Sequence, residues 1–201
     1  MRVIAGSARG RQLKGPPSRG TRPMSDKIKG ALFNSLLSLG VEPDRVLDLY
    51  AGTGSIGIEA LSRGATWADF VEHNAAAAVV VRDNLKTTEF DGQSRVHHGA
   101  VETYITTAKA APYDLLILDP PYADPEIVNT LDKVGRSQLV QSGTVVAIGH
   151  APGVILPEQL GRLSRLRHRC HGDSCFSIYD VVAADDATHG DPAAGEGKRT
   201  A

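Results

Sequence analysis

Blocks of apolar residues alternate with amphipathic stretches from about residue 44 onward. Short apolar runs bounded by turn residues are typical of buried strands, whereas apolar positions three or four residues apart are typical of helices. The alternation of the two predicts an α/β fold with a mostly parallel sheet and helices on both faces. The predicted strands span residues 45–50, 66–71, 94–98, 113–118 and 143–149, and the predicted helices span 55–63, 75–85, 101–110 and 127–134.

The start of the chain departs from this alternation. Residues 25–40 are predicted to form a helix that Ser25 caps and Gly40 ends, with its apolar stripe docked on the main domain. The preceding arm is rich in Gly, Pro and basic residues, but residues 3–6 predict a short strand. We therefore treat residues 1–43 as a basic N-terminal extension.

The end of the chain departs from it as well. Residues 163–170 and 175–182 predict a hairpin, so the last strands should be antiparallel to the rest of the sheet. The predicted α/β domain spans residues 44–183. Residues 184–201 hold almost no large apolar side chain and are expected to be a disordered tail.

Charge is distributed unevenly along the chain. The net charge is -1 over 201 residues, yet residues 1–30 hold eight of the 22 Lys/Arg and one of the 23 acids. A basic arm on an acidic body favours a polyanionic partner at one edge, with a merely solvated arm as the alternative. No apolar run is long enough for a membrane span and the first residues are too polar for a signal peptide, so we expect a cytoplasmic protein.

Cys170 and Cys175 are the only two cysteines. Their spacing lacks the second half of a zinc site, so we expect no metal. The interpretation that we favour is two thiols in a hairpin of a reduced protein, with a disulfide or a redox role as the alternative.

A glycine-rich turn follows the first predicted strand, in the stretch VLDLYAGTGSIG. Gly52 and Gly54 begin a G-x-G-x-x-G pattern, and Glu72 ends the next strand where it can accept hydrogen bonds from ribose hydroxyls. Asp48 precedes the pattern by four residues. The pyrophosphate of NAD needs no carboxylate there, whereas the ammonium group of S-adenosylmethionine does, and this favours S-adenosylmethionine.

The stretch VHHGAVETY follows the third predicted strand and should flank the adenine ring of such a cofactor. Ala100 stands where many methyltransferases present an acid, so the contact with adenine would come from backbone groups or would be absent. His97 and His98 are interpreted as ordinary residues at the end of a strand. The candidate cofactor residues are therefore Asp48, Tyr50, Gly52, Gly54, Glu72, Ala100 and Asp119.

The stretch LLILDPPY ends the fourth predicted strand and carries the sharpest chemical signal. Methylation of an exocyclic amine requires the nitrogen to pyramidalise, and two acceptors on its N–H bonds favour this: the Asp119 carboxylate and the Pro120 carbonyl. Pro120 and Pro121 fix the backbone and remove competing donors. Tyr122 offers a ring on which an extruded base can stack.

Four stretches together resemble a known family: RVIAGSARGRQLKGPP with TRPMSDKIKGALFNSL, VLDLYAGTGSIGIEALSRGA, FVEHN and LDPPY. They are similar to the bacterial methyltransferases that modify the N2 amine of guanine 966 in 16S rRNA. The resemblance covers roughly residues 2–182. It implies a Rossmann-like class I methyltransferase fold, S-adenosylmethionine as donor, and 16S rRNA in the 30S subunit or an assembly intermediate as substrate.

The resemblance assigns RNA binding to the basic arm, and the alternation of arginines in the predicted hairpin adds a second basic stripe. A merely solvated strand face is an equal alternative for that stripe. The candidate RNA contacts are Arg9, Arg11, Arg19, Arg22, Arg165 and Arg167, with Arg169 on the same predicted face. We expect a monomer. Three other functions stay open: a DNA adenine-N6 methyltransferase, a nicotinamide dehydrogenase and a non-catalytic RNA-binding assembly factor.

Overall fold

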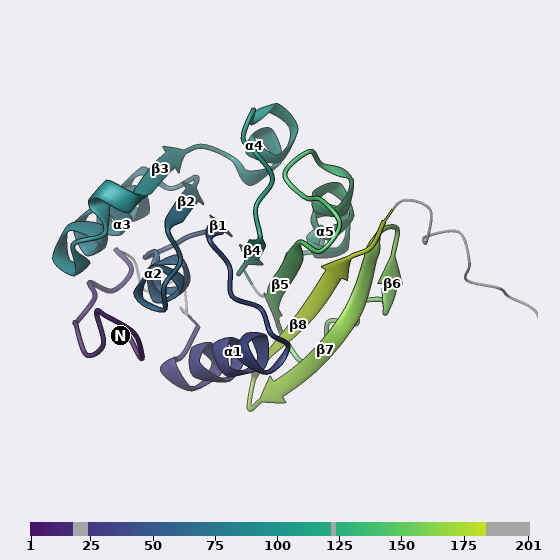
Figure 1. Cartoon of the computed structure of the whole chain (residues 1–201), viewed down its shortest axis with the longest axis horizontal. Coiled ribbons are helices and arrows are strands. Elements are labelled where there is room, and N and C mark those ends of the chain that lie inside the picture. The colour runs from purple at the N-terminus through teal and green to yellow at the C-terminus, as the bar shows by residue number, and fades with distance from the viewer. Residues whose placement is uncertain (18–23, 122–123, 184–201) are drawn as a thin grey trace, which may run out of the picture.

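The computed structural model describes residues 1–17, 24–121 and 124–183 (Figure 1). One eight-stranded sheet has the order β3-β2-β1-β4-β5-β8-β7-β6. β1 to β5 run parallel, and β8, β7 and β6 are antiparallel to their neighbours. The strands are β1 Arg45–Leu49, β2 Trp67–Glu72, β3 Ser94–His98, β4 Leu115–Leu118, β5 Val145–His150, β6 Gln159–Leu160, β7 Leu163–His171 and β8 Ser174–Val181.

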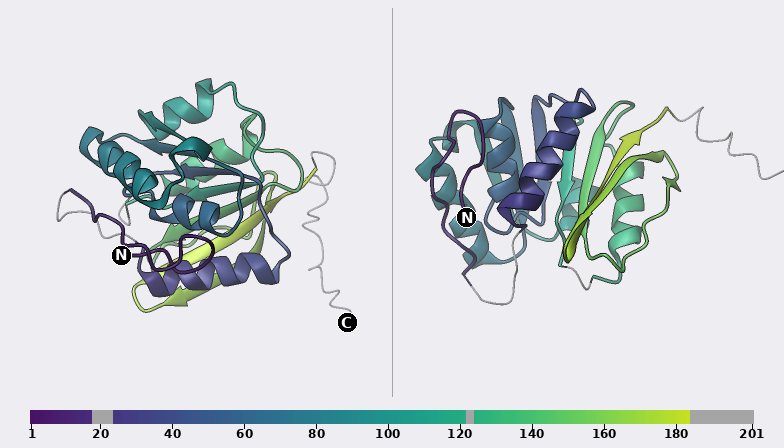
Figure 2. Two further views of the ribbon diagram at one scale, coloured as in Figure 1. Left: turned by 60° about the vertical axis from the view of Figure 1, so that its left-hand side comes forward. Right: turned by 90° about the horizontal axis from the view of Figure 1, so that it is seen from below.

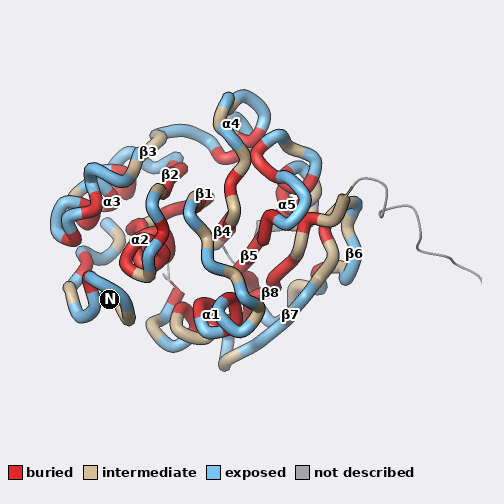
Figure 3. The backbone as a smooth tube through the Cα atoms, viewed as in Figure 1, coloured by how far each residue is buried: buried red, intermediate tan, exposed pale blue. Residues whose placement is uncertain are grey.

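Helices cover both faces of the sheet, as the figures show from several sides (Figures 1 and 2). One face packs against α1, α2 and α3, and the opposite face packs against α4 and α5. β4 and β5, in the middle of the sheet, are buried along their whole length (Figure 3). The helices are α1 Asp26–Ser38, α2 Ser55–Ser62, α3 Ala75–Thr88, α4 Val101–Thr107 and α5 Ile127–Arg136, with a 3₁₀ turn at Asp91–Gln93.

The sequence pattern predicted this architecture, including the antiparallel hairpin at the end. The Ser25 side chain caps α1 by accepting a hydrogen bond from the Ile28 N–H. The short strand β6 was not predicted, because two residues are too few to show an alternation. Among the described residues, we find no helix with the length and apolar character needed to cross a membrane.

The predicted strand at residues 3–6 is wrong. In its place the arm forms a narrow loop in which Arg2 and Gln12 make one isolated antiparallel bridge. Buried side chains fix this loop on the main domain, and Val3 and Leu13 belong to the same core as α1 and α2. Residues 1–17 therefore pack on the main domain without joining the sheet.

The predicted basic stripe on one face of the hairpin is also wrong. The pairing of β7 with β8 shifts at a bulge, so that Arg165 lies opposite Tyr179 while Arg167 lies opposite Ile178. Tyr179 and Ile178 are neighbours on one strand and point to opposite faces of the sheet. Arg165 therefore lies on the face opposite Arg167 and Arg169.

The two cysteines are not free thiols. Cys170 and Cys175 are direct cross-strand partners, with Cα atoms 4.0 Å apart, and they form a disulfide. The favoured interpretation of two reduced thiols is therefore wrong, and the alternative, a disulfide, is what the structure shows. Residues 18–23, 122–123 and 184–201, with the predicted disordered tail, lie outside the described residues.

Candidate active site

Three carboxylates gather at the carboxyl ends of neighbouring parallel strands. Asp48 comes from β1, Glu72 ends β2 and Asp119 follows β4. Because β1 lies between β2 and β4, the three groups meet at the same edge of the sheet. Open α/β sheets bind their ligands at this edge, where the strand order reverses.

Asp48 is almost fully buried, and its Oδ2 accepts a hydrogen bond of 2.9 Å from the backbone N–H of Gly57 in α2. Its Oδ1 has no hydrogen-bond partner in the part of the chain that the structure describes. Burial raises the pKa of Asp48 well above its usual value, the Gly57 N–H opposes this, and the charges of Asp119 and Glu72 add to it. The unpaired oxygen is what a cationic or proton-donating ligand group would satisfy.

Glu72 organises the glycine-rich turn. Its Oε2 accepts from the Gly52 N–H at 2.8 Å, and its Oε1 accepts from the Asn74 N–H at 2.7 Å. The backbone is left-handed at Gly52 and at Gly54, which stands directly before α2. The carboxylate oxygens can each accept a further bond, so Glu72 both shapes the turn and stays available to a hydroxyl group.

Asp119 is wedged between strands and the start of α1. Its N–H points to the Leu49 carbonyl of β1 at 3.4 Å, and a Cβ atom at Gly149 of β5 would collide with its carboxylate. Gly149 is therefore required for this close approach. The surrounding protein desolvates the carboxyl group and raises the pKa of Asp119 to about 7, although a hydrogen bond from the Met24 N–H acts in the opposite direction.

The other predicted residues on this edge lie around the carboxylates. Pro120 is buried and Pro121 is exposed, and Tyr122 lies outside the described residues. Tyr50 has a left-handed backbone, and its hydroxyl donates to Glu102 of α4 at 3.4 Å. Partial burial raises the pKa of Tyr50 to about 12. Ala100 is exposed directly before α4, beyond the end of β3.

The arm is joined to α2, α3 and the glycine-rich turn by two buried polar residues that the sequence analysis missed. Glu59 of α2 accepts from the N–H groups of Ile4 and Ala5 at 2.8 and 3.0 Å. Asn84 of α3 accepts from the Lys14 N–H at 2.7 Å and donates to the Thr53 carbonyl in the glycine-rich turn at 2.9 Å. The arm and the turn therefore share one hydrogen-bonded support.

Lys29 extends this support into α1. Its side chain is fully buried, with Nζ 2.9 Å from the Arg2 carbonyl, 3.0 Å from the Ser55 hydroxyl and 3.6 Å from Glu59. Burial lowers the pKa of Lys29, and the Glu59 charge acts against that shift. One ammonium group thus ties the arm and α1 to the first residue of α2.

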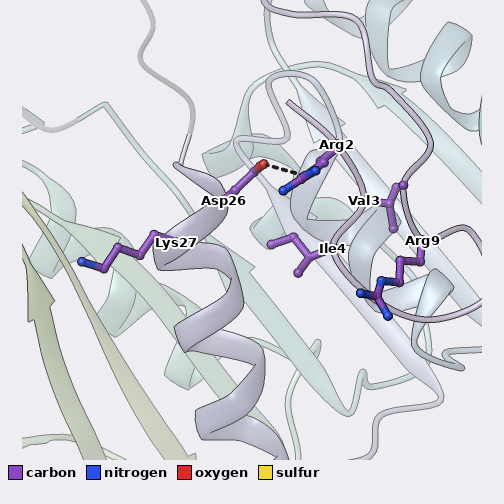
Figure 4. Close-up of a pocket in the computed structure, with 7 residues that line it drawn as sticks. Arg2, Val3, Ile4, Arg9, Asp26 and Lys27 are labelled. Carbon is purple, nitrogen blue, oxygen red and sulfur yellow. Dashed lines mark ion pairs between the residues drawn. The ribbon is translucent and has the colours of Figure 1, made fainter.

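A basic pocket lies between the arm and the start of α1 (Figure 4). Arg2, Arg9 and Lys27 belong to its lining, although the Lys27 side chain points away from the two arginines in Figure 4, and Asp26 pairs with Arg2 at 3.5 Å. Arg9 was a candidate RNA contact and belongs to this lining. Arg2 and Lys27 were not candidates, although their charge was counted in the basic arm.

Several other candidate arginines form hydrogen bonds or ion pairs with residues of this same chain. Arg11 pairs with Glu89 at 2.9 Å and donates to the Thr87 carbonyl. Arg165 donates to Glu158 at 2.8 Å and to the Leu156 carbonyl at 2.9 Å. Arg167 donates to the Ser38 hydroxyl, Arg169 is exposed, and Arg19 and Arg22 lie outside the described residues.

Comparison with known proteins gives a consistent result. The family model Conserved hypothetical protein 95 matches residues 1–180. A putative rRNA methyltransferase, YlbH, from Bacillus subtilis is 35% identical over 181 residues, which are 89% of this chain and 98% of that protein. Ribosomal RNA small subunit methyltransferase D from Escherichia coli is 35% identical over 187 residues, 93% of each chain. The chain belongs to this rRNA methyltransferase family.

The solved structures agree on the fold. A putative methyltransferase, YhhF, from Escherichia coli superposes with a TM-score of 0.78 at 28% identity, over 91% of this chain and 98% of that chain. The expected class I methyltransferase fold is therefore confirmed. The family model matches residues 1–180, which cover the arm and nearly all of the α/β domain.

One signal could have revealed Glu59 from the sequence. It stands in SIGIEALS, where the neighbouring residues are mostly apolar, and every residue of this helix is buried. A carboxylate in such a helix requires a buried partner. Asn84 and Gly149 offer no comparable signal, since their roles depend on which distant backbone reaches them.

Proposed function

We propose that this protein transfers a methyl group from S-adenosylmethionine to the exocyclic N2 amine of one guanine in 16S rRNA. The observation that carries the proposal is the position of Asp119, a desolvated carboxyl group beside the strand that holds Asp48. Family membership supports methyl transfer, and the relatives named for the small ribosomal subunit support rRNA as the substrate. The choice of the guanine N2 amine rests on the sequence resemblance.

The residues present fit the cofactor. The unpaired Oδ1 of Asp48 suits an ammonium group, and Glu72 suits the ribose hydroxyls, beside a turn whose glycines allow close approach. We assign Tyr50 and Ala100 to the rim of this site. S-adenosylmethionine supplies a methyl group on a sulfonium, an electrophile that needs no metal.

Asp119 then acts on the amine. Its carboxylate and the Pro120 carbonyl would each accept a hydrogen bond from one N–H group of the amine. This turns the nitrogen lone pair toward the methyl group. As the methyl group passes from sulfur to nitrogen, the C–S bond would break while the C–N bond forms and the donor would leave as a neutral thioether; Asp119 or water would take the proton that the nitrogen gives up. In this proposal Tyr122 stacks on the guanine, and Pro121 holds the two acceptors in place. Positioning of the two reactants supplies most of the acceleration.

The basic pocket and arm hold the RNA in this proposal. Arg2, Arg9 and Lys27 offer charge for backbone phosphates, which position a nucleic acid without reading its sequence. The arm is fixed to the glycine-rich turn through Asn84, so RNA bound on the arm is held at a constant place relative to the cofactor. We propose that the protein acts in the cytoplasm as a monomer, on the 30S subunit or an assembly intermediate.

Labelled methyl transfer tests the proposal. The full chain and S-adenosylmethionine are incubated with 30S particles from cells lacking this protein, with naked 16S rRNA, and with duplex DNA. We expect label in 16S rRNA of the particles and none in DNA. Label in DNA alone would favour an adenine-N6 methyltransferase instead. RNA binding without label on any substrate would favour an assembly factor.

A further inference from the structure

A second cluster of reactive side chains lies at the end of the β7–β8 hairpin. His168 is the cross-strand partner of Ser177, and Cys170 is the partner of Cys175. Residues two apart on a strand share a face, so these four side chains project from the same face of the hairpin. His168 and Cys170 are exposed, whereas Cys175 and Ser177 are buried.

The ligand atoms of this cluster are close enough to share one ion. Within it, His168, Cys170 and Cys175 place one nitrogen and two sulfurs within 4.8 Å of one another. The Cys170 Sγ lies 3.4 Å from the His168 Nε2. Tetrahedral zinc, with bonds of about 2.3 Å to sulfur and about 2.0 Å to nitrogen, separates two such ligands by roughly 3.6 Å. Two thiolates and an imidazole favour zinc over magnesium or calcium.

The imidazole is already oriented for such a role. Ser177 is fully buried, and its hydroxyl lies 3.2 Å from the Nδ1 of His168, which leaves Nε2 directed at Cys170. The same hydroxyl lies 3.1 Å from the Nε2 of His150, whose ring stacks on that of His168 at 5.4 Å. Histidines that bind metals usually have their second nitrogen held in this way.

We propose that reduction of the Cys170–Cys175 disulfide creates a zinc site formed by His168, Cys170 and Cys175, with water as the fourth ligand. A dithiol reductant supplies two electrons and two protons: the S–S bond breaks, both cysteines become thiols, and the reductant becomes a disulfide. Zinc then displaces the two thiol protons as the Zn–S bonds form. The disulfide and the metal are mutually exclusive, since both need the same sulfurs.

Calorimetric zinc titration of the full chain tests this proposal. The protein is reduced with excess dithiol and desalted without oxygen, and a thiol count confirms two free cysteines. We expect one Zn²⁺ per reduced chain and none in the oxidised protein. Cys170→Ser and His168→Asn should abolish the site, and both change exposed residues, so folding is expected to survive. Ser177→Ala should weaken binding about 10- to 100-fold by freeing the imidazole.

His171→Asn is the matched control, because it removes an imidazole from the same hairpin outside the three-ligand cluster. Its zinc affinity should equal that of the parent protein. Three results would each overturn the proposal: reduced protein that binds no zinc, oxidised protein that binds it equally well, or a loss in His171→Asn as large as in His168→Asn.

Discussion

At the scale of single residues, the proposed function depends most on Asp119. Its desolvated carboxyl group has a pKa of about 7, and the carboxylate is the form that accepts hydrogen bonds from an amine. We therefore expect kcat/KM for methyl transfer to rise with pH and to level off above about 7. Initial rates at limiting rRNA concentration between pH 5.5 and 8.5 would show this step.

Replacing Asp119 tests the same residue directly. Asp119→Asn keeps the shape but puts an N–H donor toward the amine, and we expect kcat to fall about 10²- to 10³-fold. The step near pH 7 should also vanish from the residual activity. The control is Asp91→Asn, on an exposed 3₁₀ turn. Single-turnover rates with full activity in Asp119→Asn would show that the carboxylate has another role.

The raised pKa of Asp119 also affects stability. An ordinary aspartate loses its proton near pH 4, whereas folded Asp119 keeps it to about 7, so the folded state binds more protons between these values. The free energy of unfolding should therefore fall as pH rises from about 4 to 7. Urea titrations at pH 5 and pH 8 measure this difference in unfolding free energy, and it should be smaller in Asp119→Asn than in the parent protein. An equal difference in the two proteins would mean that groups other than Asp119 cause the pH dependence. The pKa of Asp48 is also raised, so part of the pH dependence of stability should remain in Asp119→Asn.

The sequence correctly predicted that Asp48, Glu72 and Asp119 lie at or near strand ends, because strand, glycine-rich turn and helix follow one another with fixed spacing. It did not predict how Asp119 is desolvated. Met24 and Gly149, which surround its carboxyl group, come from distant segments that only the fold brings together.

The arm is the element whose role depends most on tertiary contacts. Its strand was predicted wrongly because Val3 and Ile4 suit a strand locally, while Glu59 offers their segment a different set of hydrogen bonds. The bulge in β7 misled in a similar way, since an alternation of arginines contains no sign of an inserted residue. Local pattern gave the element type correctly in β7 but not in the arm, and it did not show which face the β7 arginines occupy.

Glu59→Ala should detach the arm. It removes two backbone hydrogen bonds and leaves the buried Lys29 ammonium without its charge partner, which typically costs 3–5 kcal/mol, on the order of half of a domain's stability. Urea unfolding and hydrogen exchange at the Ile4 and Ala5 amides measure this. Glu89→Ala, which breaks an exposed pair with Arg11, should cost less than about 1 kcal/mol. Equal costs for both variants would contradict the role of Glu59.

Arg9→Ala should weaken RNA binding by removing one phosphate contact. The slope of log affinity against log salt should become shallower by roughly 0.7 to 0.9, with no change in which RNA is preferred. Filter binding of 16S rRNA fragments at several salt concentrations measures the slope. Arg136→Ala on α5 is the matched control, because that helix lies on the other face of the sheet. A slope unchanged in Arg9→Ala would exclude this residue from the RNA contact.

At the scale of the whole molecule, buried hydrogen bonds of Asn84 and Lys29 connect the basic arm to the glycine-rich turn and to α2. The mostly parallel sheet with helices on both faces was predictable, because mainly apolar strand segments such as β4 and β5 alternate with helical segments along the chain. The placement of the arm against the turn was not predictable, since Asn84 and Lys29 bond segments that lie far apart in the sequence.

The most direct measurement of the central claim is nucleoside mass spectrometry of 16S rRNA. The modified nucleoside identifies the atom that is methylated, independently of any rate measurement. The rRNA would come from cells that lack this protein and carry either the parent chain or Asp119→Asn on a plasmid. We predict one N2-methylguanosine that the parent chain restores and Asp119→Asn does not. A restored methyl group on adenine, on a ribose or on a ring carbon would contradict the account.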